Sequence, residues 1–143
     1  MRYLLDTNVL KEVGKPDAHQ NVRRWLDSVD DNELAISVLS IKEIFKGIEK
    51  LRAKKPDVAE ALEIGTSGLV AAFSGRLIVI NDDVARVWGT YLGRSDKHVV
   101  DKGLAASAQV HELVLVTRNT ADFQGLGIAV LDPFKASPVR YTA

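Results

Sequence analysis

Four acidic residues stand where apolar segments of this chain meet a turn or the start of a helix: Asp6, Glu43, Asp101 and Asp122. Three of these segments have the composition of buried strands, at residues 2–5, 34–36 and 113–116. If the strands lie side by side in a parallel sheet, their carboxyl ends share one edge, where open α/β folds bind ligands. Carboxylates crowded there would repel one another and raise each other's pKa values unless a cation lay between them. Oxygen ligands suit Mg²⁺ or Mn²⁺, so the pattern predicts a metal site for phosphate chemistry.

Each of the four acids also has a purely structural interpretation. Asp6 begins the sequence Asp-Thr-Asn, which is typical of a helix cap. Ser40 and Glu43 have the spacing of a capping box, in which Glu43 would accept a hydrogen bond from the Ser40 N–H. Asp101 could be the N-cap of its own helix, and Asp122 could be a solvated acid in a polar loop. The evidence for a site is therefore the joint pattern and no single residue.

Two observations favour the site over the caps. The apolar periodicity around Glu43 fits a helix that begins near Val38, which is too early for a cap at Ser40. Asp101 shares a helical row with Leu104 and the small residues that follow it, and this row is expected to face inward. Because a buried carboxylate without a partner is very costly, an inward-facing Asp101 needs a cation or a donor beside it.

Apolar runs alternate with helical patterns along the chain, which predicts a parallel sheet with crossover helices. We expect strands at residues 2–5, 34–36, 77–80, 113–116 and 128–131. We expect helices at residues 17–29, 38–53, 57–73, 82–93 and 101–111, with an irregular tail after Pro133. No repeat, low-complexity block or linker interrupts the pattern, so residues 1–143 are expected to form one α/β domain.

Composition narrows the classes of function. The chain has no cysteine, which excludes disulfides, thiolate metal sites and cysteine nucleophiles. No stretch approaches the ~20 apolar residues of a membrane span, and the first apolar run is too short for a signal peptide, so we expect a cytoplasmic protein with no membrane partner. The net charge of zero argues against nonspecific coating of nucleic acid. It does not argue against an enzyme that cuts nucleic acid, because acidic residues in the site offset lysines elsewhere.

Two local clusters of basic residues flank the acids. One is a row on the predicted helix that carries Glu43: Lys42, Lys46 and Lys50. This row is either a solvated helix face or a strip that follows a phosphate backbone. The other cluster lies next to Asp101 and comprises Arg94, Lys97, His98 and Lys102. The three histidines lack metal-ligand spacing, and we interpret each of them as a surface residue: His19, His98 and His111.

Four segments together resemble the PIN-domain ribonucleases of VapC and FitB type, which are toxins of bacterial toxin–antitoxin pairs. The segments are residues 4–10, 37–43 with Gly47, 101–108 and 115–123, and their order and spacing hold over nearly the whole chain. The resemblance implies a single PIN-like domain with a doubly wound, mostly parallel sheet flanked by helices. It also implies metal-dependent cleavage of RNA, a cognate antitoxin as protein partner, and commonly a homodimer.

The resemblance also assigns roles to particular residues. It implies that Asp6, Glu43 and Asp101 are the core catalytic acids, with Asp6 and Asp101 holding Mg²⁺ or Mn²⁺. Many relatives carry an aspartate directly after Thr-Arg, where this chain has Asn119, so either Asn119 or Asp122 fills the fourth position. Two hydroxyl residues are expected to orient the carboxylates: Thr7 and Thr117. The candidate RNA contacts are Lys42, Lys46, Lys50 and Arg118.

Two other classes of function stay open. A PIN fold could hold RNA or a protein without cutting, although a pure binder has no reason to tolerate the repulsion between the acids. A phosphotransferase or phosphatase of the haloacid-dehalogenase type could use Asp6 as a nucleophile. Such enzymes usually carry a second aspartate two residues later, and here that position is Asn8. The leading hypothesis is therefore a metal-dependent endoribonuclease toxin.

Overall fold

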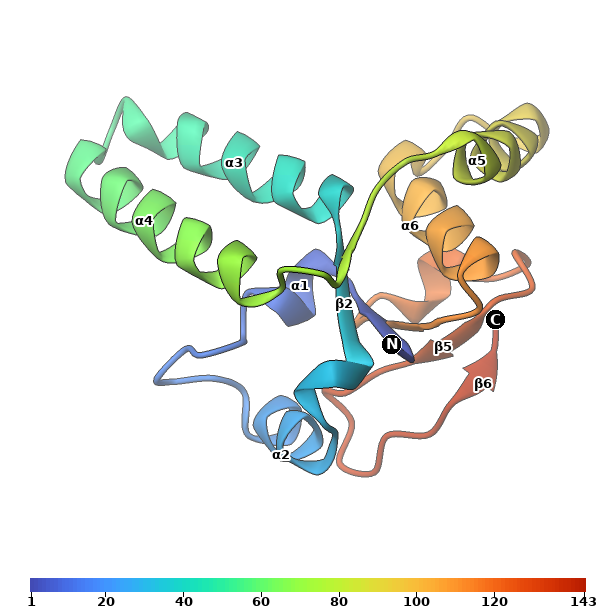
Figure 1. Cartoon of the computed structure of the whole chain (residues 1–143), viewed down its shortest axis with the longest axis horizontal. Helices are drawn as coiled ribbons and strands as arrows, with labels where there is room; N and C mark the ends of the chain where they lie inside the picture. Colours follow the sequence, from blue (N-terminus) through green and yellow to red (C-terminus); the bar gives the residue numbers. More distant parts are fainter.

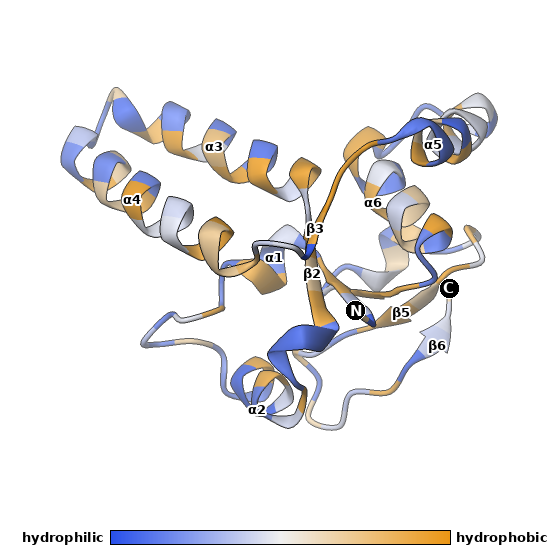
Figure 2. Cartoon of the chain, viewed as in Figure 1, coloured by the Kyte–Doolittle hydropathy of each residue, from blue (hydrophilic) through white to orange (hydrophobic).

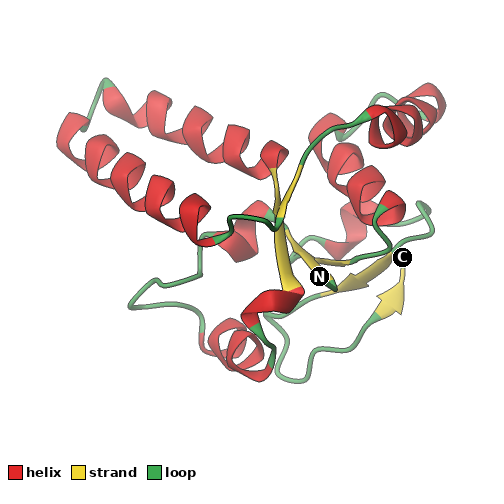
Figure 3. Cartoon of the chain, viewed as in Figure 1, coloured by secondary structure: helices red, strands yellow, loops and turns green.

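The structure, a computed structural model, describes residues 1–143 and builds them around one six-stranded sheet (Figure 1). The strands are β1 (Tyr3–Leu5), β2 (Leu34–Ser37), β3 (Leu77–Ile78), β4 (Val114–Val116), β5 (Ala129–Leu131) and β6 (Tyr141–Thr142). The α-helices are α1 (Thr7–Leu10), α2 (Gln20–Ser28), α3 (Val38–Arg52), α4 (Pro56–Ala72), α5 (Asp82–Arg94) and α6 (Val99–Val110). Two short 3₁₀ helices complete the chain, η1 (Asp31–Glu33) and η2 (Thr120–Phe123), and Figure 3 shows how helices and strands alternate.

β1 lies inside the sheet, whose strand order is β3-β2-β1-β4-β5-β6. It pairs in parallel with β2 on one side and with β4 on the other, and only β6 runs antiparallel. Leu5 is in register with Ile36 of β2 and with Val116 of β4. The residues that follow these positions therefore emerge at one edge of the sheet, next to the point where the strand order reverses.

Helices cover both faces of the sheet, with α2, α3 and α4 on one side and α5 and α6 on the other (Figure 1). The side chains of β1 alternate between these layers as the pleat of a strand requires. Tyr3 and Leu5 join the core under α2, α3 and α4, whereas Leu4 joins the core under α5 and α6. Apolar residues accordingly gather along the strands and the inner helix faces (Figure 2). None of the helices is long and apolar enough to span a membrane.

The expected α/β architecture with a mostly parallel sheet is confirmed, and the differences lie at element ends. The strand expected at 77–80 ends at Ile78, and the helix expected at 17–29 begins only at Gln20, where the His19 Nδ1 accepts the Asn21 N–H at 3.2 Å. The helix expected from residue 101 begins at Val99, which moves Asp101 into its first turn.

Besides the short helices η1 and η2, one α-helix and one strand were not expected, α1 and β6. α1 is a single turn, which is too short to show a helical period. β6 lies in the tail that was expected to be irregular, and its end is held to β5 by main-chain bonds such as Ala143 N–H to the Ile128 carbonyl at 2.8 Å. Main-chain pairing of two residues leaves no side-chain pattern from which to predict it.

Gly103 allows α6 to approach its neighbours closely. A Cβ atom at this position would lie 2.5 Å from Leu39 Cδ1 of α3 and 2.9 Å from Trp88 Cε2 of α5. Trp88 is itself fixed, because its Nε1 donates to the Val99 carbonyl at 2.8 Å. This three-way contact lies two residues beyond Asp101, so it fixes where the first turn of α6 presents that carboxylate.

We predict that Gly103→Ala lowers the free energy of unfolding by about 1–3 kcal/mol, because overpacking outweighs the gain of about 1 kcal/mol in helix propensity. Thermal unfolding followed by circular dichroism measures this. The matched controls are Gly89→Ala and Gly93→Ala on α5, where no atom lies within 4 Å of the added Cβ. These two variants should melt at or above the wild-type temperature. A Gly103→Ala protein as stable as the controls would contradict the close contact.

Candidate active site

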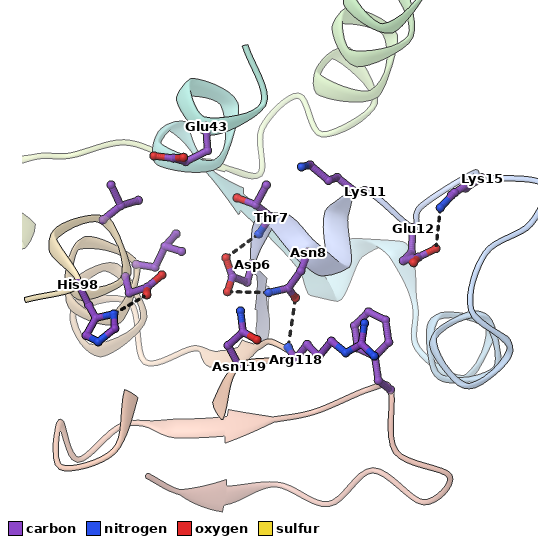
Figure 4. A pocket seen from close by; sticks show the side chains of 14 residues that line it. Asp6, Thr7, Asn8, Lys11, Glu12, Lys15, Glu43, His98, Arg118 and Asn119 are labelled. Atoms are coloured by element: carbon purple, nitrogen blue, oxygen red, sulfur yellow. Dashed lines mark hydrogen bonds and ion pairs between the residues drawn. The ribbon is translucent and has the colours of Figure 1, made fainter. Parts of the chain in front are cut away.

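An open pocket of about 590 Å³ lies at the carboxyl edge of the sheet (Figure 4). Three of the four predicted acids line it, and they come from three separate elements: Asp6 after β1, Glu43 on α3 and Asp101 on α6. The remaining polar lining includes Thr7, Asn8, Arg118 and Asn119. The predicted gathering of carboxylates at this edge is therefore present in the fold, and Asp122 is the one that lies outside this pocket.

Asp6 sits at the junction of β1 and α1, with only 6% of its surface exposed. Its Oδ1 accepts the Thr7 N–H at 2.6 Å, and its Oδ2 accepts the Thr117 hydroxyl at 2.8 Å. Burial raises the pKa of Asp6 above its ordinary value, and these hydrogen bonds oppose that rise. Asp6 is thus both the N-cap of α1 and a member of the pocket, so the two interpretations of this residue do not exclude each other.

The contacts of Asp6 correct one expectation and add a residue. Thr117 orients the carboxylate through its hydroxyl as expected, but Thr7 does so through its main-chain N–H and not through its hydroxyl. Asn8, for which the sequence predicts no role in the site, donates from Nδ2 to Asp6 Oδ2 at 3.3 Å. Its Oδ1 accepts the Arg118 N–H at 3.1 Å, so Asn8 ties the end of β1 to the loop after β4.

The residue at which α3 begins sets the position of Glu43. Ser37 is the N-cap of this helix, and its hydroxyl oxygen accepts the Leu39 N–H at 3.0 Å. The capping box between Ser40 and Glu43 is therefore wrong, since Ser40 already lies inside the helix. Lys42 Nζ donates to Glu43 Oε1 at 2.9 Å. This bond is the main cause that lowers the pKa of Glu43, so the carboxylate is ionised at neutral pH.

The lysine row lies close enough to Glu43 to influence it. The charges of Lys46 and Lys50 lower the Glu43 pKa further, after that of Lys42. Both lysines are exposed, and they stand three and seven residues beyond Glu43, on the same helical row. The row therefore borders the pocket on the α3 side without lining it.

Asp101 lies in the first turn of α6, and the N-cap of this helix is His98. The cap interpretation of Asp101 is therefore wrong. Burial is the main cause that raises the pKa of Asp101, and the charges of Asp6 and Asp122 raise it further. The inward row predicted for Asp101 is present, because Leu104 and Ala105 are buried.

The sequence places His98 in the basic cluster next to Asp101 but predicts no direct contact between the two side chains. Its backbone is left-handed, with a φ of 53°, and its Nδ1 lies 3.6 Å from Asp101 Oδ2. One ligand atom from each of His98, Asp101 and Asp122 lies within 4.8 Å of the others. His98 is exposed, as expected of a surface residue, but it also lies beside two carboxylates. Its position three residues before Asp101 was a signal for their proximity.

The fourth acidic position of the site has two candidates, Asn119 and Asp122, and they lie in different places. Asn119 lines the pocket beside Asp6 (Figure 4), and its N–H donates to Thr117 Oγ1 at 3.0 Å. Asp122 is exposed on η2 and lines a second pocket on the other side of Asp101. The amide therefore faces the acidic pocket, and the carboxylate approaches Asp101 from outside it.

Two basic residues near the pocket have different surroundings. Arg118 is exposed, lines the pocket and places its guanidinium 4.6 Å from the centre of the Phe134 ring. Lys102 is only 7% exposed, and its Nζ donates to the main-chain carbonyls of Ser95, at 2.6 Å, and of Lys97. Lys102 therefore does not belong to the exposed basic cluster in which the sequence placed it.

The donor set of the pocket fits a hard divalent cation. The carboxylates of Asp6 and Asp101 and the amide oxygen of Asn119 are the kinds of oxygen ligand that Mg²⁺ and Mn²⁺ bind. Burial and the negative charges of Asp6 and Asp122 raise the pKa of Asp101, and His98 only partly opposes them. A cation beside Asp101 would offset this charge.

The fold is a doubly wound α/β sheet, and its acidic pocket lies where the strand order reverses. The PIN domain family matches residues 3–127, and the chain belongs to that family. The chain is similar to the toxin FitB of Neisseria gonorrhoeae, with 30% identity over 138 residues that cover 92% of this chain and 97% of FitB. It is also similar to the VapC ribonuclease Y4jK of Sinorhizobium fredii, with 24% identity over 92% of this chain and 97% of that protein. A solved toxin–antitoxin complex from Klebsiella pneumoniae superposes with a TM-score of 0.67 and 27% identity, covering 92% of this chain and 97% of that one.

We predict that Asp101→Asn raises the melting temperature of the metal-free protein at about pH 7, because the variant removes an ionised carboxylate from beside other acids. The raised pKa means that folded Asp101 holds its proton at pH values where the unfolded chain has lost it. Wild-type stability therefore falls as the pH rises through that window, and the amide does not titrate. The advantage of the variant should shrink as the pH falls towards the ordinary aspartate value of about 4. Calorimetry in EDTA measures this, and an advantage that is equal at both pH values would contradict it.

A second prediction concerns the fourth position. Asn119→Asp should tighten Mn²⁺ binding by about tenfold or more, because it adds a carboxylate to the wall that holds Asp6. Asp122→Ala should weaken Mn²⁺ binding less than Asp101→Ala does, since Asp122 lies outside the pocket. Isothermal titration calorimetry compares the three variants with the wild type. An Asn119→Asp protein with wild-type affinity would show that residue 119 does not reach the cation.

Proposed function

We propose that this protein is a metal-dependent endoribonuclease that acts as the toxin of a toxin–antitoxin pair. The observation that carries the proposal is the pocket that collects Asp6, Glu43 and Asp101 at the switch point of the sheet. Membership of the PIN-domain family supports it, as does the similarity to proteins named as a VapC ribonuclease and as the toxin FitB. The chain matches nearly the full length of both relatives, so the whole domain is shared.

In the proposed reaction, Asp6 and Asp101 hold Mg²⁺ or Mn²⁺, directly or through water. When bound, the cation supplies charge stabilisation at the phosphoryl oxygens and lowers the pKa of a nearby water. The water oxygen bonds to phosphorus as the P–O3′ bond breaks, and the leaving oxygen takes up a proton. The products are a 5′-phosphate and a 3′-hydroxyl, as the resemblance to this family implies.

The protein side chains orient the reacting groups. The Thr117 hydroxyl and the Thr7 N–H each donate to one oxygen of Asp6, which fixes the orientation of this carboxylate in the pocket wall. An efficient general base has a pKa near the working pH, so the lowered pKa of Glu43 favours a different role for it. We assign Glu43 to completing the cation shell or to orienting the attacking water. The exposed Arg118 borders the same pocket, and a guanidinium suits a phosphate contact.

The antitoxin part of the proposal is supported by an apolar groove of about 750 Å³ between α3, α4 and the segment after α1. Gly47 and Gly65 leave open space along it, and Leu62 of α4 is 47% exposed on its rim. Lys11 and Lys15 line both this groove and the acidic pocket. An antitoxin segment with an apolar face, seated in the groove, would therefore reach the pocket and block it. Homodimerisation and a cytoplasmic location stay predictions.

We predict that Asp6→Asn and Asp101→Asn each reduce Mg²⁺- or Mn²⁺-dependent cleavage of RNA at least about a hundredfold, the loss of about 3 kcal/mol of transition-state stabilisation. The amide keeps the volume of the side chain and removes the charge that the cation needs. Cleavage of a panel of single-stranded RNAs by purified protein measures this. The matched control is Asp27→Asn, the same change at an exposed position on α2, which should leave cleavage unchanged.

Three results would count against the proposal. Metal-dependent cleavage that survives in either pocket variant, with contaminating nuclease excluded, would remove these residues from the catalytic role. RNA binding without cleavage by the wild type, in Mg²⁺ and in Mn²⁺, would favour a binding module on the same fold. An acid-stable, base-labile phosphate on Asp6 would instead favour the phosphotransferase class.

A further inference from the structure

A second open pocket, of about 600 Å³, adjoins the acidic pocket at His98, close to Asp101. Its polar lining includes Arg94, Ser95, Lys97, His98, Asp122 and Gln124. His98 lines both pockets and therefore forms the rim between them. A ligand that extends beyond the acidic pocket past His98 would enter this second one.

The second pocket carries two basic side chains that the fold does not use. Arg94 and Lys97 are both exposed, and none of the ion pairs in the structure includes either of them. By contrast, Arg52 and Arg86 on the surface pair with neighbouring carboxylates. Unpaired cations on a concave surface attract phosphate groups, because each phosphate bound releases counterions from the nucleic acid.

The loop between α5 and α6, which carries Lys97, is held in place by a buried lysine. Lys102 is buried, and its ammonium donates to the carbonyls of Ser95 and Lys97. The same loop ends in the left-handed turn at His98, from which α6 begins. Because these contacts lie within the protein, the loop needs no ligand to reach its conformation, and a ligand would bind without a large ordering cost.

We infer that this second pocket binds the nucleotide next to the scissile phosphate of a single-stranded RNA, with Arg94 and Lys97 contacting its phosphates. The inference rests on the proposed function and adds a substrate position to it. A volume of about 600 Å³ suits a ligand the size of one nucleotide. Ser95 and Gln124 supply donors and acceptors for the base edge or for the ribose 2′-hydroxyl, which single strands leave accessible.

The placement of the second pocket also gives the RNA strand a path. The lysine row on α3 borders the acidic pocket beside Glu43, and the second pocket adjoins it at His98. A strand that passes through both pockets would therefore meet Lys46 and Lys50 of the row as well as Arg94 and Lys97, none of which is in an ion pair. Repulsion from the acids at the centre makes such flanking charge necessary for binding.

The test compares two double variants of equal charge change. In Arg94→Gln/Lys97→Gln the two free cations of the pocket are neutralised, and in Arg24→Gln/Arg140→Gln two exposed cations that line neither pocket are neutralised. Binding of a fluorescent single-stranded RNA is measured over a salt series in Ca²⁺, and melting temperatures verify that both proteins are folded. The slope of log affinity against log salt should fall by about 1.4 in the pocket variant, about 0.7 for each phosphate contact, and stay at the wild-type value in the control.

A second readout locates the contact independently of affinity. RNA that carries 4-thiouridine is crosslinked to the wild-type protein, and the modified peptides are mapped by mass spectrometry. Crosslinks within residues 94–98 or 121–126 are expected, and crosslinks confined to other segments would overturn the inference. A pocket variant with the same salt slope as the control would overturn it as well.

The outcome also separates this inference from the proposed function. A wild-type protein that cleaves RNA while the pocket variant keeps the wild-type slope contradicts the nucleotide subsite alone. A wild-type protein that binds RNA through these cations but cuts nothing in Mg²⁺ or Mn²⁺ contradicts the nuclease proposal alone. A wild-type protein with no salt-dependent RNA binding contradicts both.

Discussion

The hydrogen bond between the Thr117 hydroxyl and the Asp6 carboxylate joins the ends of β1 and β4, and the site depends on it. A carboxylate buried to this extent is costly unless donors surround it. Here the donors come from Thr117, from Asn8 and from the Thr7 N–H, and they can converge only because Leu5 and Val116 are in register. Parallel pairing of the two strands therefore decides where the first charge of the pocket stands.

The remaining acids are arranged around that fixed charge at a cost to stability. Burial and the negative charges of Asp6 and Asp122 raise the pKa of Asp101, whereas the Lys42 bond lowers that of Glu43. The protein thus offsets the charge of Glu43 with a lysine, whereas the basic neighbour of Asp101 is the imidazole of His98. A cation that binds only the folded state would recover part of this cost, which couples occupancy of the site to stability. Repulsion retained at one edge of an otherwise well-packed sheet is typical of a functional site.

The sequence predicts those parts of the molecule that depend on local pattern. Apolar runs and helical periods place the parallel strands and the helices, and strand ends place Asp6, Glu43 and Asp101 at one edge. The sequence does not predict contacts that depend on distant segments or on unusual backbone. Asn8 bonds to the loop after β4, and His98 itself has a left-handed backbone. The buried Lys102 donates to main-chain carbonyls of the loop before α6. The short pairing of β6 leaves no side-chain signal at all.

The central claim is that this edge of the sheet holds a divalent cation between Asp6 and Asp101. Anomalous diffraction from crystals soaked in Mn²⁺ tests it most directly, because the peak locates the ion without reference to activity. A peak is expected at direct ligand distance from Asp101, with Asp6 reached directly or through one water. A well-diffracting Mn²⁺-soaked crystal with no peak in the acidic pocket would contradict the account, as would a peak confined to His98 and Asp122 outside it.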